Sequence, residues 1–212
     1  MSMRIGLDLD GTIVVYDDVF HTHAVERFGL PVDVPVDKTA VRDWLRANEP
    51  GESGWIELQR IAYGLRMAEA SLAPGLRACL KDCRDAGIDI SIISHKTRLS
   101  VAAPQVDLHA AALEWLEAAG FFAADGFGFA RDRVFFEPTR DAKLRRIASE
   151  ECSLFVDDLE EVLAEPLFPR SVERWLYAPD GRARTLDDAS VFSDWNVIAQ
   201  RARELMETRA AH

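Results

Sequence analysis

Residues 4–14 read Arg-Ile-Gly-Leu-Asp-Leu-Asp-Gly-Thr-Ile-Val, an apolar run that meets two carboxylates and a glycine. The apolar residues predict a strand buried in a sheet. Because side chains alternate along a strand, Asp8 and Asp10 lie on the same side at its end. Burying two carboxylates is costly, and a divalent cation would relieve that cost. Gly11 permits a sharp turn, and Thr12 offers a hydroxyl and an amide to an anion held there. The simpler alternative is that the two acids merely end a strand before a turn.

The composition of the 212-residue chain limits the classes of function. Its 48% hydrophobic content suffices for one substantial core with a small accessory domain. A net charge of −11 disfavours a nucleic-acid partner, but it is compatible with a small phosphorylated metabolite bound by a local cation. The three cysteines form no disulfide framework or zinc motif. No signal peptide or membrane-spanning run is recognised, so we expect a cytoplasmic protein without a membrane partner. Nothing in the sequence indicates its oligomeric state.

Apolar runs alternate with helical patterns along most of the chain. After the first strand, strands are predicted at residues 89–94, 134–136, 153–156 and 174–177, with helices at 76–86, 108–119, 140–150, 159–164 and 194–207. This alternation predicts an α/β fold with a Rossmann-like, three-layer core, in which helices cover both faces of a parallel sheet.

The stretch from residue 15 to 73 breaks this alternation. It predicts helices from about Ala24, at Asp37–Ala47 and at Trp55–Ala70, separated by proline and glycine turns. We therefore expect a catalytic core of residues 1–14 and 74–212, and a small α-helical cap of residues 15–73 that acts as a lid over the strand ends.

The segment Asp-Leu-Asp-Gly-Thr-Ile at residues 8–13 resembles the first motif of the haloacid dehalogenase superfamily, whose members are mostly phosphatases. Three later segments resemble the remaining motifs of that superfamily, in order. Ser94 ends the run Ile-Ile-Ser and resembles the second motif, a hydroxyl that holds the transferring phosphoryl group. Lys143 stands near the start of a helix and resembles the third. Asp157 and Asp158 end an apolar run and resemble the fourth, whose acids complete a magnesium shell.

The residues themselves suit phosphoryl transfer, which needs a nucleophile, a proton donor, a cation and groups that hold the phosphoryl oxygens. Asp8 is the expected nucleophile, and Asp10 the expected general acid and base. The resemblance makes Lys143 the residue that neutralises charge on the nucleophile and the phosphoryl group. Oxygen ligands without cysteine or histidine suit Mg²⁺. We expect the metal ligands to be Asp8, Asp10, Asp157 and Asp158, and the phosphate-binding residues to be Gly11, Thr12, Ser94, His95 and Lys143.

The sequence thus predicts a magnesium-dependent phosphatase that hydrolyses a small-molecule phosphate monoester through an aspartyl-phosphate on Asp8. A hydrolytic dehalogenase is disfavoured, because dehalogenases of the superfamily lack the second acid that Asp10 supplies. A phosphomutase remains open. A phosphonate hydrolase would need a cap lysine, and Lys38 is the only lysine between residues 14 and 73. A non-catalytic binding or regulatory protein on the same fold also remains open. The sequence does not name the substrate; candidate contacts in the cap are His21, His23, Arg27, Trp55 and Arg60.

Overall fold

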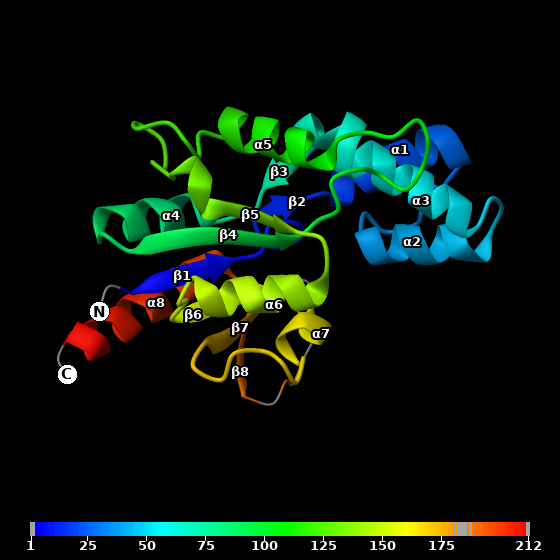
Figure 1. Ribbon diagram of the computed structural model, residues 1–212. Helices are drawn as coiled ribbons and strands as arrows, with labels where there is room; N and C mark the ends of the chain where they lie inside the picture. Colours follow the sequence, from blue (N-terminus) through cyan, green and yellow to red (C-terminus); the bar gives the residue numbers. More distant parts are fainter. Residues whose placement is uncertain (1–2, 180, 182–185, 187, 211–212) are drawn as a thin grey trace. The chain divides into compact units, whose positions relative to one another are not determined.

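The computed structural model describes residues 3–179, 181, 186 and 188–210. Its main feature is a six-stranded sheet in the order β5-β4-β1-β6-β7-β8, in which every described strand pair is parallel (Figure 1). The strands are β1 (Arg4–Leu7), β4 (Asp89–His95), β5 (Val134–Glu137), β6 (Leu154–Asp157), β7 (Glu173–Tyr177) and β8 (Ala189–Phe192). Because β1 lies between β4 and β6, the carboxyl ends of these three strands meet at one edge of the sheet, where α/β proteins bind ligands.

The register of the central strands fixes which residues meet at this edge. Leu7 pairs with Ile92 of β4 and with Val156 of β6. The next residue, Asp8, continues the ladder by donating its backbone N–H to Val156 O at 2.9 Å. Asp8 therefore lies level with Asp157, the last residue of β6.

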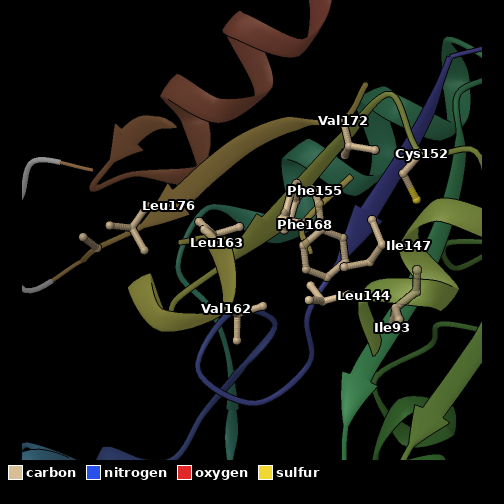
Figure 2. Packing of buried hydrophobic residues seen from close by; sticks show 11 residues of the cluster. Ile93, Leu144, Ile147, Cys152, Phe155, Val162, Leu163, Phe168, Val172 and Leu176 are labelled. Atoms are coloured by element: carbon tan, nitrogen blue, oxygen red, sulfur yellow. The ribbon is translucent and has the colours of Figure 1, made fainter. Parts of the chain in front are cut away.

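One face of the sheet is covered by α6 (Arg140–Ser149) and α7 (Glu160–Leu163). Figure 2 shows how apolar side chains from these helices and from the strands pack together. The buried cluster consists of Ile93, Leu144, Ile147, Cys152, Phe155, Val162, Leu163, Phe168, Val172, Leu176 and Ala178. Gly6 in β1 belongs to this packing, because a Cβ there would lie 2.4 Å from Cδ2 of the Phe155 ring.

The other face is covered by α4 (Leu76–Asp85) and α8 (Trp195–Ala210), which pack against each other. Side chains that alternate with those of the first face point this way. Their contacts bring together Ile5, Leu7, Leu154 and Trp175 of the strands with Cys79, Leu80, Trp195 and Ile198 of the helices. The three layers predicted from the sequence are thus confirmed.

A second compact unit consists of Val14–Ser71 and Lys96–Ala119. It contains α1 (Asp17–Phe28), α2 (Lys38–Ala47), α3 (Glu52–Arg60), a π-helical turn η1 (Ile61–Leu65), a 3₁₀ turn η2 (Met67–Glu69) and α5 (Leu108–Ala118). Trp115 of α5 donates its indole N–H to Ala70 O at 3.0 Å, and α5 packs on η1 and η2. From the sequence, residues 96–119 are expected in the core, whereas the structure groups them with the helical unit. That this unit acts as a cap stays a prediction.

The remaining elements are short. β2 (Val14–Val15) and β3 (Ser71–Leu72) form a separate two-stranded sheet, and a 3₁₀ turn, η3 (Arg131–Arg133), precedes β5. Among the described residues, the helices are all too short or too polar to cross a lipid bilayer.

Candidate active site

A buried lysine joins the ends of the two central strands. Lys143 Nζ lies 2.6 Å from Asp8 Oδ1 and 2.6 Å from Asp157 Oδ2. The exposed fractions of Lys143, Asp8 and Asp157 are 1%, 5% and 0%. One ammonium group is therefore held between two carboxylates away from water, where charge-assisted hydrogen bonds are strong.

The start of α6 places Lys143 at this point. Thr139 caps the helix, since its hydroxyl oxygen accepts from Ala142 N at 3.1 Å. Lys143 N–H then donates to Thr139 O within the first turn of the helix. The Lys143 ammonium also lies 5.3 Å from the centre of the Phe155 ring, so an aromatic face supports the cation from the side of the core.

A third carboxylate, that of Asp158, completes the group. Carboxylate oxygens of Asp8, Asp157 and Asp158 all lie within 4.8 Å of one another. Asp157 Oδ1 also accepts from the backbone N–H of Leu159 at 2.9 Å. The cluster contains three acidic residues and one lysine, so acidic groups outnumber basic ones within it. A donor set made only of carboxylate oxygens fits a hard divalent cation.

The loop after β1 contacts this third carboxylate closely. Gly11 has φ = 92°, and a Cβ on it would lie 2.2 Å from Asp158 Oδ2. The hydroxyl of Thr12 donates to Asp158 Oδ1 at 3.2 Å. From the sequence, the hydroxyl and the amide of Thr12 are expected near a bound anion; in the structure the hydroxyl donates to a carboxylate, and phosphate binding by Thr12 stays a prediction.

The electrostatics of the cluster favour neutralisation of Asp8. Burial, together with the Asp157, Asp158 and Asp10 carboxylates, raises the pKa of Asp8 to about 8, although the Lys143 ammonium opposes this rise. The two carboxylates beside Lys143 keep its pKa above the ordinary value despite burial. Lys143 is therefore an ammonium ion at neutral pH. A divalent cation at the cluster would favour the ionised form of Asp8.

Three further predicted residues lie near the same edge of the core. Ser94 is 1% exposed and lies in β4, the strand next to β1. His95 follows it as an exposed residue; partial burial of the ring and the Lys143 and Arg140 charges lower its pKa, against a hydrogen bond to the Pro138 backbone. Asp10 is half-buried, and its charge acts on Asp8. Among the described residues, the carboxylate cluster consists of Asp8, Asp157 and Asp158 and does not include Asp10. Its role as a metal ligand stays a prediction, as do the roles of Ser94 and His95.

Comparison with known proteins gives structural matches only. No protein-family model and no curated protein matches the sequence. A haloacid dehalogenase (HAD) family hydrolase from Deinococcus radiodurans R1, solved with bound phosphate and sodium, has a TM-score of 0.62 at 13% identity, covering 95% of each chain. A predicted phosphatase from Clostridium acetobutylicum has a TM-score of 0.60 at 13% identity, covering 96% of this chain and 99% of its own. The L-2-haloacid dehalogenase from Xanthobacter autotrophicus, with chloropropionic acid covalently bound, has a TM-score of 0.52 at 15% identity, covering 96% and 99%.

The chain has the haloacid dehalogenase fold. The sequence motifs that resemble those of the superfamily therefore stand on a fold of the matching kind. In this haloacid dehalogenase fold, Asp8, Lys143, Asp157 and Asp158 are brought together although they lie up to 150 residues apart in the sequence.

The candidate contacts in the helical unit have partners inside that unit. His21 Nε2 lies 3.1 Å from Val34 O, and the buried His23 ring lies between Glu26 and Glu69, at 3.1 and 2.9 Å. Three more residues stabilise the unit in the same way: Trp55 stacks on Phe20, and Arg27 and Arg60 both pair with Glu57. These contacts explain the residues as packing of the helical unit, and none of them identifies a substrate.

Proposed function

We propose that the protein is a magnesium-dependent phosphatase that hydrolyses a small-molecule phosphate monoester through an aspartyl-phosphate on Asp8. The observation that carries the proposal is the buried Lys143 held at 2.6 Å from both Asp8 and Asp157, with Asp158 completing a carboxylate cluster. A nucleophilic carboxylate, a fixed cation and a set of hard oxygen donors are the parts that phosphoryl transfer requires.

Asp8 and Asp10 divide the chemistry between them. A carboxylate oxygen of Asp8 attacks phosphorus, the bond from phosphorus to the substrate oxygen breaks, and Asp10 gives its proton to the leaving alkoxide. Asp10 then takes a proton from a water molecule that attacks the phosphorus of the aspartyl-phosphate. Inorganic phosphate leaves, and the Asp8 carboxylate is regenerated.

The other residues bind and orient the phosphoryl group. Lys143 holds Asp8 in place through its 2.6 Å contact and offsets the negative charge that gathers as the phosphoryl group arrives. Ser94, at the end of the neighbouring strand, offers a hydroxyl donor to a phosphoryl oxygen. Mg²⁺, when bound by Asp8, Asp157 and Asp158, supplies further charge neutralisation; Asp10 is the fourth proposed ligand.

Structural neighbours of both chemistries share the fold, so the reaction has to be decided by residues. The Clostridium protein is described as a predicted phosphatase, and the Xanthobacter protein as a haloacid dehalogenase. Asp10 favours the phosphatase, because an alkoxide leaving group needs a proton and a halide does not.

The test is phosphate release from a broad panel of phosphate monoesters, in Mg²⁺ and in chelator, with halide release from 2-chloropropionate measured in parallel. Asp8→Asn removes the nucleophile, and Asp125→Asn, at an exposed position of the same unit, is the matched control. We expect Mg²⁺-dependent phosphate release by the wild type and by Asp125→Asn, and none by Asp8→Asn. Halide release without phosphate release would contradict the proposal, as would phosphate release that persists in Asp8→Asn.

A further inference from the structure

Thr12 lies in the loop that is predicted to bind phosphate, but its side chain donates a hydrogen bond to the Asp158 carboxylate. Its side chain is 0% exposed, and its hydroxyl lies 3.2 Å from Asp158 Oδ1. Because an ionised carboxylate only accepts hydrogen bonds, the threonine is the donor. A hydroxyl has one proton, so this contact uses the only hydrogen that the Thr12 side chain could offer to a phosphoryl oxygen.

The residue before Thr12, Gly11, restrains the Asp158 carboxylate through close packing. Gly11 adopts φ = 92°, where residues with a side chain are strained. A Cβ at this position would lie 2.2 and 2.8 Å from the two carboxylate oxygens of Asp158 and 2.5 Å from its carboxyl carbon. The carboxylate of Asp158 is therefore packed against the glycine backbone while Thr12 holds one of its oxygens.

Asp157 and Asp158 are held differently. The two oxygens of Asp157 accept from Lys143 Nζ and from the Leu159 backbone N–H, so rigid groups fix this carboxylate. Asp158 Oδ1 instead accepts a hydrogen bond from the Thr12 hydroxyl. Residues that hydrogen-bond to a metal ligand set its orientation and contribute to metal affinity.

We propose that Thr12 is a positioning residue whose hydroxyl orients Asp158 for the metal, with Gly11 providing the space, and that this hydroxyl does not bind the phosphoryl group. This inference rests on the proposed function, since it assumes that Mg²⁺ binds at the carboxylate cluster. It extends that proposal by assigning the end of the first motif to the metal site.

The test is isothermal titration of the full-length protein with MgCl₂. Thr12→Val keeps the shape of the buried side chain and removes the hydroxyl, whereas Thr12→Ser keeps the hydroxyl. We expect Thr12→Val to raise the Kd for Mg²⁺ roughly 10- to 100-fold, the range seen for residues behind metal ligands, and Thr12→Ser to stay near the wild type. Circular dichroism and the melting temperature in chelator show whether each variant is folded.

Two further readouts separate positioning from phosphate binding. At saturating Mg²⁺, the inhibition constant of inorganic phosphate should be the same in Thr12→Val and in the wild type. In an Asp158→Asn background, Thr12→Val should have no further effect on the Kd for Mg²⁺, because both changes act through one carboxylate.

The outcomes distinguish the two proposals. An unchanged Kd for Mg²⁺ in Thr12→Val, or a weakened affinity for inorganic phosphate at saturating Mg²⁺, overturns the role of Thr12 and leaves the phosphatase intact. Wild-type protein that binds no Mg²⁺ overturns both. If Thr12→Val unfolds, Thr12→Ala removes the same hydroxyl: a raised Kd for Mg²⁺ supports the inference, and an unchanged Kd overturns it.

Discussion

Removing the charge of Lys143 should destabilise the protein strongly. Lys143 is 1% exposed and is the cation that separates Asp8 from Asp157. Lys143→Met keeps much of the buried volume but leaves Asp8 and Asp157 without their shared cation in a region from which water is largely excluded. Breaking a buried ion pair in this way costs about 3–5 kcal/mol. For a chain of this size each kcal/mol corresponds to roughly 2–4 °C, so we expect the melting temperature to fall by about 6–20 °C.

The assay is thermal unfolding in chelator, with two comparison variants. Lys81→Met, at an exposed position of α4, should leave the melting temperature nearly unchanged. The double variant Asp8→Asn/Lys143→Met replaces one of the opposed carboxylates by a neutral amide, so it should be more stable than Lys143→Met alone. Mg²⁺ should stabilise Lys143→Met, because a bound cation replaces the missing charge. A melting temperature within about 2 °C of the wild type would refute the reasoning, as would destabilisations that simply add in the double variant.

Three other changes test separate parts of the account. Because burial raises the pKa of Asp8 from its ordinary 3.8 to about 8, Mg²⁺ must displace a proton below that pH. The Kd for Mg²⁺ should therefore fall as pH rises towards 8 and then level off. Isothermal titration at a series of pH values measures this, and a Kd that does not change with pH would contradict the prediction. In the metal-free protein the same shift gives a stability contribution that is greatest below pH 3.8 and is lost as pH rises through about 8. Gly6→Ala places a Cβ 2.4 Å from the Phe155 ring and 2.9 Å from Cys152 Sγ. The free energy of unfolding measured in urea should therefore fall by about 1–3 kcal/mol. An unchanged free energy would show that neighbouring side chains move aside without cost. Asp37→Ala removes the cap that accepts from Ala40 N at 2.7 Å and should cost about 1 kcal/mol, seen as faster amide exchange in α2.

Much of the core could be predicted from local sequence patterns. The runs at Asp89–His95 and Leu154–Asp157 are strongly apolar and end in polar groups, which is typical of buried parallel strands. Helix α4 was predictable from the proline and glycine around it, and α6 from Thr139 at its N-cap. These patterns depend on residues that are close in the sequence, so they can be recognised without knowledge of the tertiary structure. The order of the motifs then indicated which strand ends meet.

The features that were missed depend on long-range packing. Helix α5 was predicted as a helix, but its pattern does not tell which body its buried residues Leu108, Ala112 and Trp115 pack against. Strand β8 was not predicted, because Ser190 and Val191 are both exposed and the strand is defined by its pairing with β7. Such an edge strand is defined by its neighbour and carries no alternating pattern of its own.

The direction of the Thr12 hydroxyl was missed for a related reason. Thr12 and Asp158 are 146 residues apart, and their hydrogen bond exists only because β1 and β6 are adjacent. From the sequence, a hydroxyl after two acids could serve either an anion or an acid. The positive φ of Gly11 and its close approach to Asp158 were equally invisible before the strands were paired.

The central claim is that Asp8 is the nucleophile, and acid-quenched peptide mass spectrometry tests it most directly. Wild-type protein would be mixed with an aryl phosphate that it hydrolyses in Mg²⁺, quenched within one turnover and digested. The account predicts that the peptide containing residues 4–14 gains the mass of one phosphoryl group on Asp8, and that Asp8→Asn shows no such gain. Turnover in which the phosphoryl group is found on another residue, or on none, would contradict the account.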